Sequence, residues 1–306
     1  MSAQSIQRTM VDLFCTDDFD LDCEMPSRLD FVQSRIPRPH NYSLWGWAMN
    51  HTLFPYYASF LSYPQKVALM QSITQSSKGN RLHISQRYIH KQRLKCCPEC
   101  MIEDDNVFGQ PYWHVSHQPA SIRVCLKHNS VLLDQCVSCG MGFTPRRDEF
   151  LECQIKCRCG HDLTVTCLTS KIDKIQKEKL TKLAQNTLNQ MGRLQDILIW
   201  DIDGSSLAKE YCGLTPSWIN DKSRRQKYIE HLMHFFGHDL WSMLLSNTKL
   251  PEYWLYRLYY WDKPMDPLFY YLMLFYSESM NVKSTKEVAS TSQSEEVWGS
   301  LYARDV

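Results

Sequence analysis

Long apolar segments are missing from this chain of 306 residues. A helix that crosses a bilayer needs about 20 consecutive apolar residues, and no stretch comes near that length. The first residues, MSAQSIQRTMVDLF, also lack the basic segment and apolar run that mark a secretory signal. These absences predict a protein without membrane spans that works in the reducing cytoplasm.

Common signatures of catalysis are missing as well. The chain has neither the Gly-x-x-x-x-Gly-Lys-Ser/Thr loop that cradles phosphates nor the Gly-x-Ser-x-Gly turn that presents a serine nucleophile. Its 33 acidic residues include no pair that the sequence places together as a two-metal nuclease site. The acidic stretch DDFDLDCE lacks the glycine and final glutamate of an EF-hand loop, so we expect a solvated loop there. The sequence therefore predicts a protein that is not an enzyme.

Acidic residues are absent from residues 31–98, which carry nine Lys or Arg. Residues 1–30 have the opposite bias, with seven acidic and two basic residues, and the net charge of the whole chain is only +1. A run of cations without acids is typical of nucleic-acid binding, although a solvated basic face beside the acidic N-terminus is the alternative. The residues that we expect to contact nucleic acid are Lys78, Arg81, Arg87, Lys91, Arg93 and Lys95.

Cysteine, by contrast, is abundant, and ten of the 13 cysteines lie between Lys95 and Cys167. A structural zinc ion takes four thiolate or imidazole ligands in a tetrahedron, and short loops supply them two at a time. Four such loops are present: Cys97-x2-Cys100, Cys125-x2-His128, Cys136-x2-Cys139 and Cys157-x-Cys159. They predict two structural zinc ions, because every ligand position is filled and none is left open for an activated water.

Sequential pairing is the simplest arrangement of these ligands. It gives one site of Cys97, Cys100, Cys125 and His128, and a second site of Cys136, Cys139, Cys157 and Cys159. Interleaved pairing is the alternative, and Cys153 is an alternative to Cys157. Disulfides would need an oxidising compartment. Two further cysteines, Cys96 and Cys167, are expected to be small buried apolar residues. Gly140 and Gly160 follow two of the loops, where glycine permits the positive φ angle of a tight turn.

Periodicity indicates helices on both sides of the cysteine-rich segment. The predicted fold is mostly α with a small central zinc-ribbon-like β region. We expect a helical, basic N-terminal part (1–94), tandem zinc-binding modules (95–168), a helical C-terminal domain (169–276) and a flexible tail (277–306). One amphipathic helix is predicted over Ser170–Arg193, with an apolar stripe of Ile172, Ile175, Leu180, Leu183 and Leu188.

Two features of the C-terminal domain bear on binding. Ser206–Gly237 resembles a helix-turn-helix unit whose Lys222, Arg224, Arg225 and Lys227 would face phosphates, although a small helical packing unit is favoured because the turn spacing is off by one residue. Asp239–Tyr276 is dense in aromatic residues, most of them expected in the core. We expect some of Tyr253, Tyr256, Tyr259 and Tyr260 to face outward as a partner surface.

Several motifs closely resemble the TniQ/TnsD family of transposon target-selection proteins. The most specific are CCPEC (96–100), YWHVSHQPAS (112–121), VCLKH (124–128) and CVSCG (136–140). Upstream, MPSRLDFV (25–32) and NHTLFPYYASFL (50–61) are also similar, and downstream PLFYYLMLF (267–275) is. Lys95 stands where the family usually has Arg, and the family's N-terminal Pro-x-x-x-Glu-Ser motif and the long TnsD-type C-terminal extension are not found.

The resemblance implies a function. The chain would be a non-catalytic target-site selector in the bacterial cytoplasm. It would bind target DNA or a guide-RNA effector complex and recruit the AAA+ ATPase that regulates the transposase, with a homodimer as a further possibility. The alternatives are a generic zinc-finger transcriptional regulator and a nuclease whose zinc is structural only.

Overall fold

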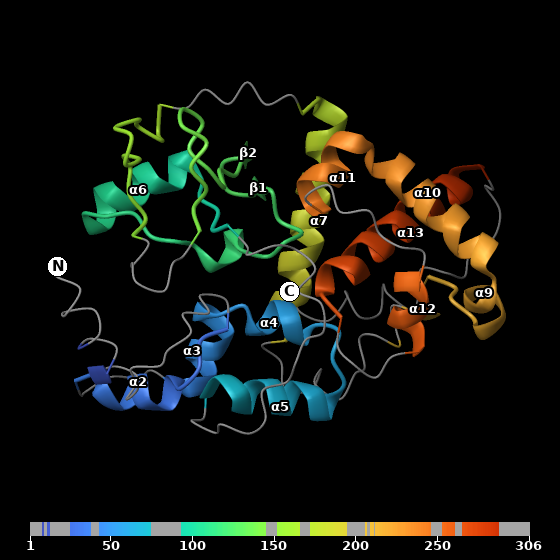
Figure 1. Cartoon of the computed structure of the whole chain (residues 1–306), viewed down its shortest axis with the longest axis horizontal. Coiled ribbons are helices and arrows are strands. Elements are labelled where there is room, and N and C mark those ends of the chain that lie inside the picture. The colour runs from blue at the N-terminus through green and yellow to red at the C-terminus, as the bar shows by residue number, and fades with distance from the viewer. Residues whose placement is uncertain are drawn as a thin grey trace.

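The computed structural model describes the helical N-terminal part, the cysteine-rich segment and the helical C-terminal part of the chain (Figure 1). The residues that it describes are 8, 11–12, 25–37, 43–74, 93–144, 152–165, 172–194, 206, 209–210, 212–245, 253–260 and 265–287. Within these residues, no helix is long and apolar enough to cross a membrane.

Four short helices make up the described N-terminal part: α2 (Leu29–Arg35), α3 (Leu44–His51), α4 (Phe54–Ala58) and α5 (Tyr63–Thr74). Ser43 begins α3 as an N-cap, because its hydroxyl accepts a hydrogen bond from the Gly46 amide. A proline in the first turn begins α4, where the missing N–H of proline costs no helical hydrogen bond. All five residues of α4 are buried, so its aromatic side chains belong to the core and not to the surface.

The cysteine-rich segment has little regular structure. It contains α6 (Pro98–Phe108), the 3-10 turn η1 (Val115–His117) and two antiparallel strands, β1 (Val124–Cys125) and β2 (Ser130–Val131). Isolated bridges pair Cys96 with Leu133, Gln135 with Gly142 and Lys156 with Asp162. The predicted mostly helical fold is confirmed, and the described β region is smaller than a full zinc ribbon because most antiparallel pairings extend for one residue pair only.

The C-terminal part is built on α7 (Lys174–Arg193), which lies at the centre of the molecule (Figure 1). Along the chain it is followed by α9 (Pro216–Asn220), α10 (Lys222–Phe236), α11 (His238–Leu245), α12 (Tyr253–Tyr260) and α13 (Pro267–Glu287). Asp173 caps α7 with a capping box, since its carboxylate accepts the Gln176 amide while the Gln176 side chain accepts the Asp173 amide. The helix therefore begins four residues later than predicted.

A single set of buried side chains joins the N-terminal helices, the first part of the cysteine-rich segment and the C-terminal helices. Helix α7 contacts β1, α4 and α13. The Tyr56 and Tyr271 rings stack with centroids 5.7 Å apart, and those of Phe60 and Tyr270 lie 4.6 Å apart. The predicted domain boundaries stay a prediction, but residues on both sides of them share this core.

Two details differ from the sequence expectations. Ile175 is 66% exposed, because the buried stripe of α7 starts only at Leu180. Helix α13 continues to Glu287, so residues 277–287 of the expected flexible tail are helical. The other residues expected in that tail, and the whole acidic stretch at residues 17–24, lie outside the described residues.

Candidate metal centres

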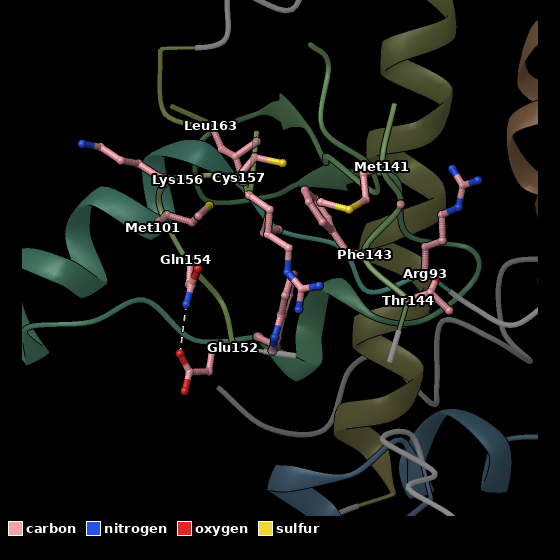
Figure 2. Close-up of a pocket in the computed structure, with 14 residues that line it drawn as sticks. Arg93, Met101, Met141, Phe143, Thr144, Glu152, Gln154, Lys156, Cys157 and Leu163 are labelled. Atoms are coloured by element: carbon pink, nitrogen blue, oxygen red, sulfur yellow. Dashed lines mark hydrogen bonds between the residues drawn. The ribbon is translucent and has the colours of Figure 1, made fainter. Parts of the chain in front are cut away.

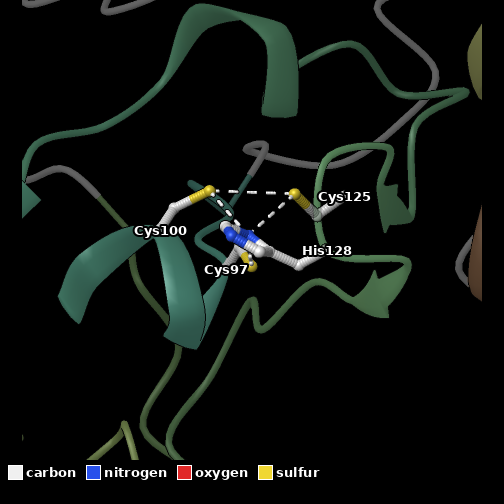
Figure 3. Close-up of side chains that lie close together, drawn as sticks. All are labelled: Cys97, Cys100, Cys125 and His128. Carbon is white, nitrogen blue, oxygen red and sulfur yellow. Dashed lines mark hydrogen bonds between the residues drawn. The ribbon is translucent and has the colours of Figure 1, made fainter. Parts of the chain in front are cut away.

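The first cluster of metal-ligand side chains contains Cys97, Cys100, Cys125 and His128 (Figure 3). The first two come from α6, where Cys97 is the N-cap and Cys100 lies in the first turn. The other two come from the β1–β2 hairpin, at the end of β1 and in its turn. All four ligand atoms lie within 4.8 Å of one another, and the three cysteines are almost fully buried.

The distances within this cluster fit a tetrahedral site. Zn–S bonds of about 2.3 Å and Zn–N bonds of about 2.0 Å place ligand atoms roughly 3.5–3.8 Å apart. The Cys100 and Cys125 sulfurs are 3.7 Å apart, far longer than a disulfide bond. The Nδ1 atom of His128 lies 3.4 Å from the Cys97 sulfur and 3.3 Å from the Cys100 sulfur. The donor set and its spacing could therefore hold one metal ion.

Two carboxylates support these ligands from outside. The Nε2 atom of His128 lies 3.1 Å from Glu103 Oε1, which fixes the imidazole so that Nδ1 faces the cluster. Lys127 forms an ion pair with the same carboxylate. On the other side, Glu99 accepts a hydrogen bond of 3.0 Å from the Ser130 hydroxyl, which itself lies 3.2 Å from the Cys97 sulfur. These partners were not predicted from the sequence, although Glu103 follows Cys100 by three residues and so shares its helix face.

The second cluster contains Cys136, Cys139, Cys157 and Cys159. The sulfur–sulfur distances are 3.8 Å from Cys136 to Cys159 and 3.7 Å from Cys139 to Cys157, again those of a tetrahedral site. Cys139 and Cys159 are exposed, and the cluster sits on a small core of its own. Sequential pairing is thus the arrangement in the structure, and Cys157 rather than Cys153 belongs to the cluster.

The remaining cysteines of the segment have other roles. Cys96 and Cys153 are buried in the smaller core, and burial raises the pKa of the Cys153 thiol to about 12. Both thiols therefore stay protonated and act as small apolar groups, as expected for Cys96. Cys167 lies outside the described residues.

Tight turns present three of the four ligand pairs. The residue after the second ligand has a positive φ angle in each: Asn129 (50°), Gly140 (71°) and Gly160 (86°). This conformation directs backbone N–H groups toward the first sulfur of the pair, and hydrogen bonds from the Ser138 and Cys139 amides lower the pKa of Cys136 to about 6 despite its burial. The turn glycines were predicted but Asn129 was not, because asparagine adopts the left-handed conformation less often than glycine.

The close approach of the four side chains shifts the pKa values of the first cluster. Hydrogen bonds from Cys100 lower the pKa of Cys125 to about 2, while its neighbours raise the pKa of Cys100 far above that of a free thiol. Burial lowers the pKa of His128, but its contacts with Glu103 and Cys97 outweigh burial and raise it to about 9. Cysteine and histidine bind a metal ion in their deprotonated forms, so metal binding at this cluster would be linked to proton release.

Comparison with known proteins identifies the segment that contains this cluster. Residues 2–132 match the TniQ family. The chain is also 25% identical over 118 residues to the transposon Tn7 transposition protein TnsD of Escherichia coli, a match that covers 37% of this chain.

Residues 2–132 are a TniQ segment, and the chain is similar to TnsD. The TniQ match includes helices α2 to α6, strands β1 and β2, and all four residues of the first cluster. The second cluster lies beyond it. The chain spans only 23% of the length of the curated relative that it matches.

Lys95, in the TniQ segment, does not fit the predicted nucleic-acid contact. The residue is only 2% exposed, and its ammonium donates hydrogen bonds to the carbonyls of Pro119 (2.6 Å) and Ile122 (3.0 Å). The Gln118 side chain forms two hydrogen bonds with the Lys95 backbone: its oxygen accepts one from the Lys95 amide, and its nitrogen donates one to the Lys95 carbonyl. The prediction for Lys95 is wrong because these internal carbonyls, and not solvent, surround the charge.

The other predicted nucleic-acid residues are only partly described. Arg93 is exposed, and its guanidinium donates a hydrogen bond of 2.6 Å to the Gln135 side chain. The remaining four, Lys78, Arg81, Arg87 and Lys91, lie outside the described residues.

In the part of the helix-turn-helix-like unit that the structure describes, α9 and α10 follow one another. Gly213, with φ of 66°, precedes α9, and Thr215 and Asp221 cap the two helices. Arg225 is buried and donates to the Ile219 carbonyl, so the expectation that it contacts phosphate is wrong. The three other basic side chains, Lys222, Arg224 and Lys227, are exposed.

Proposed function

We propose that this protein is a non-catalytic target-site selector of a Tn7-like transposon. The observation that carries the proposal is the match of residues 2–132 to the TniQ family, together with a structure in which that segment brings together four side chains that could hold a metal ion. The similarity to TnsD, whose name assigns it to Tn7 transposition, supports the same role.

Both clusters bind zinc in this proposal, and the zinc is structural. Each has four sulfur or nitrogen donors at tetrahedral spacing, the donor type that zinc prefers. The cysteines of the first cluster belong to the main core, which also contains residues of the N-terminal helices and of α7, and β1 contacts α7, so the metal would help to hold the TniQ segment to the rest of the chain. The Ser121 hydroxyl, 2.8 Å from that of Thr187 on α7, adds a polar contact to this junction.

A selector must join two partners. We propose that basic surface of this chain contacts target DNA or a guide-RNA effector complex, and that another surface recruits the AAA+ ATPase that regulates the transposase. Exposed cations on α10 and Arg93 support the first contact. The exposed Tyr256 and Tyr260, each 41% exposed with ring centroids 4.8 Å apart, support the second contact or association with another copy.

The proposal is tested by transposition in cells that supply the transposon ends, the transposase and the ATPase of the same element. Removal of this protein should abolish insertion at the selected site, and Cys97→Ser should do the same because the first metal site is lost. Cys153→Ala is the matched control, since it removes a buried thiol from the same segment but outside both clusters.

A second experiment separates the proposal from its alternatives. The tagged, metal-loaded protein should retain the element's ATPase in a pull-down, whereas a transcriptional regulator would bind promoter DNA and leave the ATPase in solution. Cleavage of labelled DNA by the purified protein with Mg²⁺ would instead identify a nuclease and refute the non-catalytic role.

A further inference from the structure

A cavity of about 300 Å³ lies beside the second metal cluster (Figure 2). It is formed by the segment that enters the cysteine-rich region, by α6 and by the two short hairpins that carry the second cluster. Its volume is at the lower end of the range for small-molecule sites, about 300–1,000 Å³. The cavity therefore has room for one planar group of the size of a nucleobase.

The floor of the cavity is apolar and aromatic. Met101, Leu163 and Phe143 line it and are 1%, 3% and 8% exposed. The half-buried Trp113 lies beside Phe143, with ring centroids 5.7 Å apart and planes inclined at 49°. An indole face of this kind is a stacking platform, and a planar ligand gains more from it than a branched aliphatic one.

The rim of the cavity is mainly cationic. Arg93, Lys156 and Arg158 line it and are all exposed, while Glu152 is the acidic residue among the lining residues. The Glu152 carboxylate accepts a hydrogen bond of 3.0 Å from the Gln154 amide. Figure 2 shows Arg93 and Lys156 at opposite ends of the cavity. This charge favours an anionic ligand that extends past both ends.

Arg93 is held in place by a close backbone approach. The Leu94 amide donates to the Phe143 carbonyl at 2.8 Å, which pairs the two segments. The Arg93 side chain then crosses Gly142 so closely that an added Cβ would lie 2.6 Å from its Nε atom. Its far end is fixed by the hydrogen bond to Gln135. Only glycine at position 142 permits this position of the guanidinium.

We propose that this cavity binds one unstacked nucleotide of a single-stranded nucleic-acid segment. The base stacks on Trp113, and the phosphates on either side of it meet Arg93 at one end and Lys156 with Arg158 at the other. Stacking on an aromatic floor with cations along the backbone is the general mode of single-strand recognition. An apolar side chain of a partner protein would fill the floor but leave the cations of the rim without a role.

The inference deepens the proposed function, on which its biological role rests, by naming the form of nucleic acid contacted. It can nevertheless be tested apart from transposition. The probe is a fluorescein-labelled single-stranded oligodeoxythymidylate of eight nucleotides, and the readout is fluorescence anisotropy of the zinc-loaded full-length chain. A duplex of the same length is measured in parallel.

The double variant Lys156→Gln/Arg158→Gln should weaken single-strand binding and reduce the salt slope by about 0.7 for each phosphate that the protein no longer neutralises. Trp113→Leu should weaken binding about tenfold with an unchanged slope, because it removes stacking and no charge. The control is Lys182→Gln, which removes an exposed cation of α7 outside the cavity and should leave affinity unchanged. Thermal melting verifies that each variant is folded.

Two results would overturn the inference: equal affinities for the double variant and the control, or duplex binding as tight as single-strand binding. Because both the lysine and the arginine of the double variant are exposed, a folding defect does not obscure its result. If these oligonucleotide results hold while the ATPase is not recruited, the proposed function fails and the nucleotide site stands.

Discussion

Loss of the two metal sites should have unequal consequences. The first cluster is part of the main core, where Cys97, Cys100 and Cys125 are 0%, 4% and 2% exposed. The second cluster lies in the smaller core, and its Cys139 is exposed. We therefore predict that Cys97→Ser destabilises the whole protein and that Cys139→Ser unfolds mainly the second module.

The magnitude follows from the energy of metal binding. A structural zinc contributes about 10–16 kcal/mol to the folding of a zinc finger, and the free energy of unfolding of a typical domain is only about 5–15 kcal/mol. Loss of the first metal thus removes as much energy as the whole core provides. Loss of the second metal removes a similar amount of energy, but it destabilises only the smaller core of about nine buried side chains, which is separate from the main core.

Hydrogen exchange measured by mass spectrometry distinguishes the two outcomes, with zinc content determined on the same samples. Cys97→Ser should be insoluble or exchange rapidly throughout, including α7 and α13. Cys139→Ser should lose one zinc and exchange rapidly at residues 133–165, while α7 stays protected. The control Cys153→Ala should retain two zinc ions. Rapid exchange in α7 of Cys139→Ser would refute the separation of the two cores.

Two further predictions concern surface and core. Lys95→Met leaves the carbonyls of Pro119 and Ile122 without a hydrogen-bond donor, so it should lower the free energy of unfolding, measured by chemical denaturation, by about 2–4 kcal/mol. The salt dependence of DNA binding should not change. A reduced salt slope would instead show that Lys95 contacts phosphate as first predicted. The double variant Tyr256→Ala/Tyr260→Ala should lower the free energy of unfolding by less than about 2 kcal/mol, because both rings are 41% exposed. It should also abolish association with a second copy or the ATPase, measured by size-exclusion chromatography. A large fall in melting temperature would assign the two rings to the core.

The metal ligands could be predicted from the sequence because the relevant information is local. Two ligand-type residues separated by one or two residues specify the donor set, and the glycine after two of the four pairs specifies the turn that presents it. Which pair meets which is a question of tertiary structure, and the proximity of α6 to the β1–β2 hairpin answers it. Cys153 has no such turn after it, which explains why Cys157 is the ligand.

Burial of charged residues could not be predicted in the same way. Lys95 and Arg225 occur in basic runs that indicate solvent exposure, yet each donates to a backbone carbonyl. Lys95 contacts a loop that is distant in sequence, since Pro119 lies 24 residues away. Arg225 contacts Ile219, which lies just before the start of α10. A basic run indicates only that cations are present, whereas the burial of each one depends on the fold.

The position of the cavity links the second metal site to nucleic-acid binding. Cys157 is both a ligand of the second cluster and part of the cavity wall, and Lys156 and Arg158 flank it directly. The turn that binds the metal therefore also sets the directions of both cations. Metal loss from the second cluster should abolish single-strand binding even if the main core stays folded, so Cys139→Ser should bind the oligonucleotide no better than the Lys156→Gln/Arg158→Gln variant. If Cys139→Ser loses its zinc yet binds as tightly as the original protein, the cations act independently of the turn and the cavity is not the site.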